Sequence, residues 1–388
     1  MNNMNSLNDT IQALSPQLRE LSDAIWNHPE LAYNEYFASE KAAAFLREQN
    51  FETVSKYCQV DTAFMAHYGE GTPSFAIFAE YDALHDIGHG CGHNLICTAA
   101  AAAFCAVAAE LKKQNLPGRI VLLGSPAEES GGGKIKLING GALKDIGAAM
   151  MVHPSFRTVP DAGSSAITRY TVTFHGKAAH AAGSPELGIN ALSAVNLLFA
   201  GVNAYREHIP EDSRMHGIIL EGGEAPNIVP SKAVCRFFLR ATSQKWINII
   251  EKRFLDMVRG AELMTGATAE VELYNVPYMA NRPNAALNRA YLEGISFNGM
   301  QHVIPEHGSR GSSDFGNVAQ TVPGIHPYFA VTTEKIALHS TQFRDAAITD
   351  LAFENTLKAA SAMAHTALKY LTESDFRQEV HADFASKN

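Results

Sequence analysis

The first part of the chain alternates short apolar segments with longer segments of helical spacing, and this alternation limits it to few folds. Residues 119–124 and 148–152 are almost continuously apolar, as strands are when both faces of a parallel sheet are covered. Between the strands predicted over 74–79 and 119–124 lies a long apolar segment, 95–113, typical of a buried helix. Strands that alternate with helices predict an α/β sheet.

Ionisable residues follow these predicted strands where each strand ends. Asp82, the pair Glu128-Glu129 and His153 each lie just past the C-terminal end of one strand. Because open α/β sheets assemble their sites at this edge, we expect these side chains to share one site. For the two glutamates the alternative is a solvated acidic turn. Their place between a buried strand and a glycine run favours the site.

A glycine-rich segment, Gly88-His-Gly-Cys-Gly-His-Asn94, places Cys91 and His93 two residues apart in a predicted tight loop. A thiolate and an imidazole together are suited to zinc, although the pair alone is a weak indication. A hydrolytic metal site needs about three protein ligands per ion and a nearby carboxylate base. Of two adjacent glutamates, one can bind metal while its neighbour takes a proton.

From about residue 166 the pattern changes. The order over 166–281 is strand, helix, two strands, helix and strand, which is that of a ferredoxin-like βαββαβ unit. A chain of 388 residues is long enough for two domains. We therefore expect one α/β domain formed by 1–165 and 282–388, interrupted by a smaller domain. The polar tail after Thr372 is expected to lack order.

Composition limits the cellular compartments and the classes of binding partner that we expect for this protein. The net charge of −9 favours neither nucleic acid nor an anionic membrane surface as a partner. The first residues contain no basic segment followed by an apolar core, so no signal peptide is expected. Five cysteines without disulfide-like spacing fit a reducing compartment. We therefore expect a cytoplasmic protein.

Eight segments occur in an order typical of one family, at 79–84, 88–94, 126–129, 152–154, 176–182, 226–230, 311–318 and 323–327. Together they resemble the dimetal amidohydrolases of peptidase family M20. The nearest branch contains hippurate hydrolase, auxin-conjugate amidohydrolases and p-aminobenzoyl-glutamate hydrolase subunits. The C-terminal segments are similar to a subgroup with an animal dipeptidase that cleaves β-alanyl-lysine-type peptides. The resemblance implies a phosphorylase/hydrolase-like catalytic α/β domain with an inserted ferredoxin-like lid (dimerisation) domain.

The resemblance also implies a reaction and its residues. The enzyme would cleave the amide bond of an N-acyl amino acid or dipeptide-like substrate with two divalent ions, zinc or alternatively manganese. Glu128 would be the general base and later the acid to the leaving amine. Asp82 would either orient a metal-bound imidazole or balance the charge of the metal ions. Much of the wider family has a metal-binding histidine where Glu80 stands and a carboxylate where Cys91 stands, so Cys91 is our choice of bridging ligand. The implied ligands are Cys91, His93, Glu129, His153 and His339.

In the inserted domain, the resemblance assigns His180 to the oxyanion of the partner subunit's site in a homodimer. It assigns Asn227 and Arg240 to the substrate. The structural alternatives are a surface histidine in a turn and an arginine on a solvent-facing strand. The loop at 308–314 is either a substrate contact or a purely structural loop.

Two other functions stay open at this point. Cys91 could be a nucleophile activated by His93, although two residues of separation make this pairing awkward and the other candidate ligands would have no role. The chain could also be a metal-retaining binding or regulatory protein, against which the intact Glu128 argues. The substrate, whether a dipeptide, an N-acyl amino acid or a p-aminobenzoyl-glutamate type, is not set by the sequence.

Overall fold

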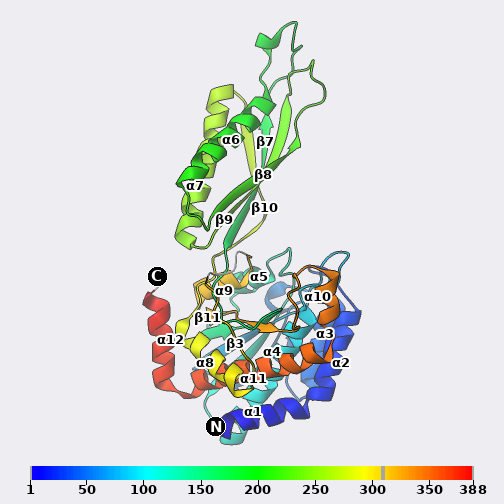
Figure 1. Ribbon diagram of the computed structural model, residues 1–388, viewed down its shortest axis with the longest axis vertical. Helices are drawn as coiled ribbons and strands as arrows, with labels where there is room; N and C mark the ends of the chain where they lie inside the picture. Colours follow the sequence, from blue (N-terminus) through cyan, green and yellow to red (C-terminus); the bar gives the residue numbers. More distant parts are fainter. Residues whose placement is uncertain (1, 307–310, 387–388) are drawn as a thin grey trace. The chain divides into compact units, whose positions relative to one another are not determined.

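The computed structural model describes residues 2–306 and 311–386, and the chain forms two compact units (Figure 1). Unit 1 consists of Met1–Gly163, Asn281–Ser309 and Asp314–Asn388. Unit 2 consists of Ser164–Ala280 and Arg310–Ser313. Along the chain, unit 2 is an insertion into unit 1.

The centre of unit 1 is a six-stranded sheet with the order β1-β2-β4-β3-β5-β11. The predicted α/β fold class is confirmed, but the sheet is mixed, because β1 and β2 run antiparallel to their neighbours. The strands β3, β4, β5 and β11 are parallel. A separate parallel pair joins β6 (His153–Ser155) to β12 (Tyr328–Ala330). The sheet strands are β1 (Thr53–Ser55), β2 (Phe64–Glu70), β3 (Ser74–Glu80), β4 (Gly118–Ser125), β5 (Ala148–Met150) and β11 (Gly324–Ile325).

Helices cover both faces of this sheet, which explains its continuously apolar strands. Phe75 and Ile77 pack with α4 (His93–Gln114) and α11 (Asp350–Thr372) in one core cluster. Phe78 and Leu123 share the other cluster with α5 (Gly133–Asn139) and α9 (Phe315–Thr321). The other helices of unit 1 are α1 (Asn2–Ala13), α2 (Ser15–Asn27), α3 (Tyr36–Glu48), α8 (Ala285–Phe297), α10 (Thr341–Ala346) and α12 (Ser374–Ser386), with a 3-10 turn at Tyr57–Gln59.

Helix α4 is the central helix of unit 1. It is long and apolar enough to cross a membrane, but 94% of its apolar stretch is buried inside the protein. It is therefore a core helix rather than a membrane span, as predicted. Its first residue is His93, and near its far end Glu110 accepts a hydrogen bond from Ser6 of α1. Helix α4 thus links the glycine-rich loop to the amino-terminal helix.

The expectation of a disordered tail is wrong, because Ser374–Ser386 form helix α12. Phe376 and Val380, four residues apart, are buried in the core of unit 1. Arg377 donates hydrogen bonds to the carbonyls of Tyr370 and Leu371 at the end of α11. The polar composition of the tail concealed this short apolar stripe.

Unit 2 has the predicted βαββαβ order and a four-stranded antiparallel sheet, β10-β7-β9-β8. Val172, Phe174 and Phe237 share its core with helices α6 and α7. Strand β8 lies at the sheet edge, where Ile218 and Ile219 are 60% and 45% exposed. The elements are β7 (Ala166–His175), α6 (Ala191–Tyr205), β8 (Arg214–Glu221), β9 (Lys232–Ala241), α7 (Gln244–Thr265) and β10 (Thr268–Tyr278), with 3-10 turns at Pro185–Leu187 and Arg206–His208.

Candidate metal centre

The carboxyl ends of β3, β4 and β5 lie at one edge of the sheet because these neighbouring strands are parallel. Asp82 follows β3, Glu128 and Glu129 follow β4, and His153 comes shortly after β5. The sheet topology therefore converts four distant sequence positions into one neighbourhood, as predicted from the strand ends.

The glycine-rich loop adds two further side chains to this edge. Cys91 lies in the loop, and Gly92 turns the chain into α4 with φ +69°. A Cβ atom at Gly92 would lie 2.7 Å from the Pro154 side chain, so a larger residue would not fit. His339 joins the same loop, because its backbone N–H donates to the carbonyl of Gly90 at 3.1 Å.

The side chains of the five predicted ligands lie close together, and we call these residues the metal cluster. Within three groups, all potential ligand atoms lie within 4.8 Å of one another. Cys91 is shared by two of the groups. The groups are Cys91 with His93 and His153, Cys91 with Glu129 and His339, and His93 with Glu128 and Glu129.

Asp82 orients His93 from behind. Its Oδ1 atom lies 3.0 Å from His93 Nδ1, and its Oδ2 atom accepts the backbone N–H of Glu129 at 2.9 Å. Burial alone would raise the pKa of Asp82, but His93 and this N–H outweigh it and lower that pKa. The carboxylate therefore stays ionised and leaves His93 Nε2 facing the cluster.

His153 is held in a similar way by a backbone carbonyl. Its Nδ1 atom lies 2.7 Å from the carbonyl oxygen of Pro154, which leaves Nε2 for another partner. Burial and the neighbouring His93 lower the pKa of His153 to about 3. The imidazole is therefore neutral, which is the form that binds metals.

The buried polar atoms of this edge fit a pair of cations. Among the described residues, His93 Nε2, Glu129 Oε1 and Glu80 Oε2 are buried without a hydrogen-bond partner. His93 Nε2 lies 3.7 Å from the Glu129 oxygen and 3.6 Å from the Glu80 oxygen, too far for hydrogen bonds. Such orphaned atoms are costly unless something binds them. Thiolate, imidazole and carboxylate together suit divalent transition metals.

Glu128 sits on a strained turn. Ala127, the residue before it, has φ +60°, a left-handed conformation that costs a residue with a Cβ atom roughly 1–2 kcal/mol. The carbonyl of Ala127 accepts hydrogen bonds from Gly131 and Gly132 at 2.9 and 2.8 Å. Burial, followed by Glu80 and Glu129, raises the pKa of Glu128 well above its ordinary value. The carboxyl group is thus biased toward holding a proton.

A second charged group, which sequence reasoning missed, lies beside the metal cluster. We call Lys134, Glu80 and Asp314 the lysine cluster. The Lys134 ammonium donates to Glu80 and, at 2.6 Å, to Asp314 Oδ1, and its backbone N–H donates to Asp314 Oδ2 at 3.0 Å. All three side chains are buried. A lysine directly after the glycine run was the one available signal, since a buried lysine requires carboxylates.

His326 is a second residue that sequence reasoning missed. Its ring lies 5.6 Å from that of His153 and stacks on Tyr328, and its buried Nε2 atom has no hydrogen-bond partner among the described residues. Burial, with His153 next in importance, lowers the pKa of His326 well below its ordinary value. It lies in the segment 323–327, whose resemblance to the family was the available signal.

The other predicted site residues belong to unit 2. His180 is exposed, and its Nδ1 atom accepts the backbone N–H groups of Ala182 and Gly183 at 3.2 and 2.9 Å. Because Nδ1 accepts these two bonds, a ring proton lies on Nε2. The carbonyl of Asn227 accepts the N–H of Ala181 at 3.0 Å, so these two loops are joined.

Arg240 lies on β9 and is half-buried. It donates to the Ser312 hydroxyl at 3.1 Å, and burial together with Arg169 lowers its pKa. Of the predicted loop 308–314, residues 308–310 lie outside the described residues.

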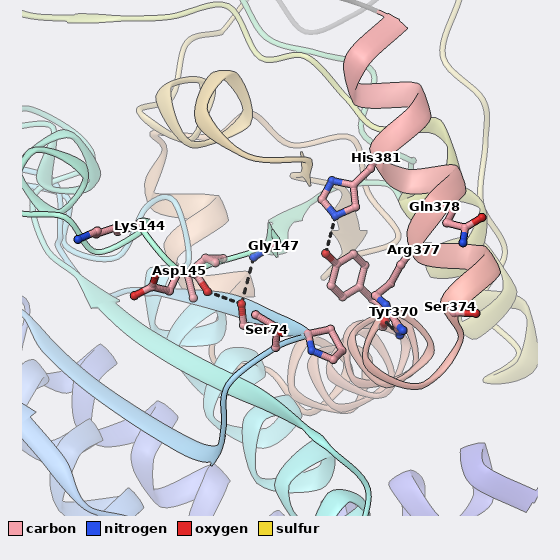
Figure 2. A pocket seen from close by; sticks show the side chains of 12 residues that line it. Ser74, Lys144, Asp145, Gly147, Tyr370, Ser374, Arg377, Gln378 and His381 are labelled. Carbon is pink, nitrogen blue, oxygen red and sulfur yellow. Dashed lines mark hydrogen bonds between the residues drawn. The ribbon is translucent and has the colours of Figure 1, made fainter.

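A hollow of about 770 Å³ lies at the opposite edge of the sheet (Figure 2). It is lined by Ser74 at the start of β3, by Gly147 before β5, and by residues of α11 and α12. Tyr370 Oη lies 2.8 Å from His381 Nε2 across it. No predicted site residue lines this hollow, so it is separate from the metal cluster.

Comparisons with known proteins agree with this geometry. Residues 72–369 match the family described as Peptidase family M20/M25/M40. The chain is 36% identical to a Xaa-Arg dipeptidase from Homo sapiens, with 98% of this chain and 91% of the relative covered. It is 29% identical to a p-aminobenzoyl-glutamate hydrolase subunit from Escherichia coli, over 96% of this chain and 93% of the relative.

Solved structures share the fold. A dinuclear metal binding peptidase of the M20 family from Bacillus subtilis superimposes with a TM-score of 0.74 at 20% identity, over 93% of this chain and 99% of that chain. The chain therefore belongs to peptidase family M20/M25/M40 and is a dinuclear metal-dependent hydrolase that cleaves the amide bonds of dipeptides or N-acyl amino acids.

Proposed function

We propose that this chain is a cytoplasmic zinc-dependent dipeptidase in which the metal cluster holds two ions and Glu128 is the general base. The observation that carries the proposal is the convergence of five ligand side chains, with buried unpartnered atoms, around one carboxyl group. The thiolate of Cys91 and three imidazoles favour zinc over manganese. We choose Cys91 as the bridging ligand because it belongs to two groups of ligand atoms. One group contains His93 and His153, and the other contains Glu129 and His339.

The side chains divide the work of hydrolysis among them. Bound divalent ions would supply Lewis-acid activation of water and of the scissile carbonyl. Glu128 takes a proton from the attacking water and returns it to the leaving amine. Its raised pKa means that this carboxyl group holds a proton more readily than an ordinary glutamate does, as a group that carries a proton from water to the amine must. Asp82 keeps His93 oriented throughout.

The predicted domains and the residues of unit 2 extend this proposal. Residues 1–165 and 282–388 would form the catalytic domain, and 166–281 the lid (dimerisation) domain. His180 presents an Nε2–H donor suited to an oxyanion. Arg240 would hold the substrate carboxylate, and Asn227 would contact the substrate.

A homodimer is proposed through strand β8. Ile218, Ile219 and Leu220 of this edge strand are 60%, 45% and 46% exposed. An exposed apolar strand edge is otherwise open to unwanted pairing, and a partner strand would cover it. Analytical ultracentrifugation should give a dimer that Ile218→Lys weakens, whereas a monomeric wild-type protein would contradict this assignment.

For the substrate we propose dipeptides with a basic C-terminal residue, on the strength of the 36% identity to the Xaa-Arg dipeptidase. The test is a panel of Xaa-Arg and Xaa-Lys dipeptides, N-acyl amino acids and p-aminobenzoyl-glutamate, run on protein of measured metal content. We expect the highest kcat/KM on the basic dipeptides. A preference for p-aminobenzoyl-glutamate would instead favour the activity named for the Escherichia coli relative.

Activity assays after chelation and after alkylation distinguish a metal-dependent mechanism from a cysteine nucleophile. Dialysis against a strong chelator should abolish turnover, and zinc should restore it. Burial and Glu129 raise the pKa of Cys91 well above its ordinary value, the opposite of what an activated nucleophile requires. Activity that survives chelation but is lost on alkylation would support the cysteine mechanism. Tight binding without hydrolysis of any member of the panel would support a binding or regulatory protein.

A further inference from the structure

The turn that carries Glu128 is held by a loop that lies 92 to 98 residues earlier in the sequence. We call residues 126–131 the base turn, and residues 30–35, between α2 and α3, the clamp loop. Glu35 of the clamp loop accepts the backbone N–H of Ala127 on its Oε1 atom at 2.8 Å. Tyr33 donates its hydroxyl to the carbonyl of Gly131 at 2.7 Å. The two contacts hold both ends of the base turn.

The Glu35 carboxyl group is buried, and each of its two oxygens accepts a hydrogen bond. The Glu35 side chain has no exposed surface, and its second oxygen, Oε2, accepts the hydroxyl of Thr62 at 3.0 Å. The carbonyl of Thr62 in turn accepts the hydroxyl of Tyr81, directly after β3, at 2.6 Å. The carboxyl group therefore links the base turn to the end of the neighbouring strand through one buried chain of hydrogen bonds.

The local role expected for Glu35 is taken by another residue. Glu35 stands at the N-cap of α3, but its side chain makes no capping bond there. Instead Glu30 accepts the first free N–H groups of this helix, from Phe37 at 3.0 Å and Ala38 at 2.9 Å. The Glu35 side chain accepts no N–H group of its own helix, and its Oε1 atom accepts the N–H of Ala127.

The need for such a contact follows from the backbone of Ala127. A residue with a Cβ atom adopts φ +60° only where the surroundings hold it. The turn cannot relax toward its other end, since a Cβ at Gly131 would lie 2.4 Å from the Tyr33 ring and one at Gly133 1.8 Å from the Pro126 carbonyl oxygen. Glu128 follows directly, and a displacement of about 1 Å can cost a catalytic group on the order of 10²-fold in rate.

We propose that Glu35 is a positioning residue for Glu128, because it fixes the Ala127 peptide in the left-handed conformation that places Glu128 beside His93 and Glu129. The inference rests on the proposed role of Glu128 as the base. It predicts that Glu35 acts on kcat through the geometry of the base turn, without touching the substrate.

The test compares Glu35→Leu, which removes the acceptor, with Glu35→Gln, which keeps an oxygen for the Ala127 N–H. Glu30→Ala is the matched control. It also removes a carboxylate of the clamp loop that accepts backbone N–H groups, but those groups belong to α3 and not to the base turn. We expect kcat of Glu35→Leu to fall by about 10²-fold with KM nearly unchanged. Glu35→Gln should stay within about fivefold of the wild type, and Glu30→Ala near the wild type.

A second readout does not depend on the chemistry. Amide hydrogen exchange of peptides covering 124–133 should become faster in Glu35→Leu and stay at the wild-type rate in Glu35→Gln and Glu30→Ala. Unchanged exchange in Glu35→Leu, or a kcat equal to that of Glu30→Ala, would overturn the proposal. If Glu128→Gln keeps its turnover, the proposed base is wrong, while the exchange comparison still decides whether Glu35 holds the turn.

A gentler pair of variants covers the case in which Glu35→Leu does not fold. Thr62→Val removes the hydroxyl that holds Glu35, and Thr62→Ser keeps it. Faster exchange of the base turn and a several-fold lower kcat in Thr62→Val alone support the proposal. Identical behaviour of the two variants would contradict it.

Discussion

The metal cluster and the lysine cluster are neighbours, yet they balance their charges differently. In the lysine cluster, the Lys134 ammonium donates to both Glu80 and Asp314. In the metal cluster, His93 Nε2 and Glu129 Oε1 are buried without such a partner among the described residues. Glu80 stands at the border, with Oε1 on Lys134 and Oε2 3.6 Å from His93. Where the chain supplies its own cation the group is structural, and where it does not the group is open to an external ion.

The largest difference between the two clusters is expected from Glu128→Gln, which should affect turnover but not stability. This change replaces a carboxyl group beside both clusters but none of the five proposed ligands. Turnover should fall by about 10²–10⁴-fold, because the proton acceptor is lost. Metal content and the unfolding midpoint should stay at the wild-type level. Retained turnover, measured on the best substrate of the panel, would remove Glu128 from the role of base.

Lys134→Met instead removes the cation of the lysine cluster. It leaves two buried carboxylates without their cation, and removing one partner of a buried ion pair costs about 3–5 kcal/mol. We expect this loss in the free energy of unfolding, measured with denaturant. The exposed Lys144 is the control, since Lys144→Met removes an equal charge and should change stability little. Equal stability of the two variants would show that Lys134 does not compensate the carboxylates.

Glu35 adds a third case to this comparison, a buried carboxyl group that has no cationic partner within the part of the chain that the structure describes. Burial, followed by the charge of Asp82, raises its pKa from 4.5 to about 7. Between these values the folded state binds the proton more tightly than the unfolded state. The contribution of Glu35 to the free energy of unfolding should therefore fall by roughly 3 kcal/mol as pH rises from 4.5 to 7, and then stay level.

The matched measurement compares the wild type with Glu35→Gln across this pH range. The groups that face Glu35, namely Asp82, Tyr33 and Tyr81, are the same in both proteins. Glu35→Gln should gain stability relative to the wild type as pH rises. Parallel stability curves would mean that Glu35 keeps an ordinary pKa.

Sequence patterns predicted the parts of this molecule that depend on neighbours along the chain. The period of apolar residues gave both sheets and the buried helix α4, and the strand ends with the glycine-rich loop indicated where the metal cluster would lie. The lysine cluster escaped prediction because Lys134 and Asp314 are 180 residues apart. The clamp loop escaped because nothing in the sequence marks Ala127 as left-handed. The helix at 374–386 was mistaken for a tail because only two of its side chains are buried.

Helix α4 connects the metal cluster to a distant part of unit 1. It begins at His93 and extends for 22 residues, or about 33 Å at the usual rise. Because a buried helix moves as a stiff rod, a small tilt introduced at one end displaces the other. The contacts of Glu110 and Lys113 with Ser6 of α1 anchor the end far from the metal. We therefore expect substitutions of Ser6 in the amino-terminal helix to act on the position of His93 from a distance, without touching a proposed ligand.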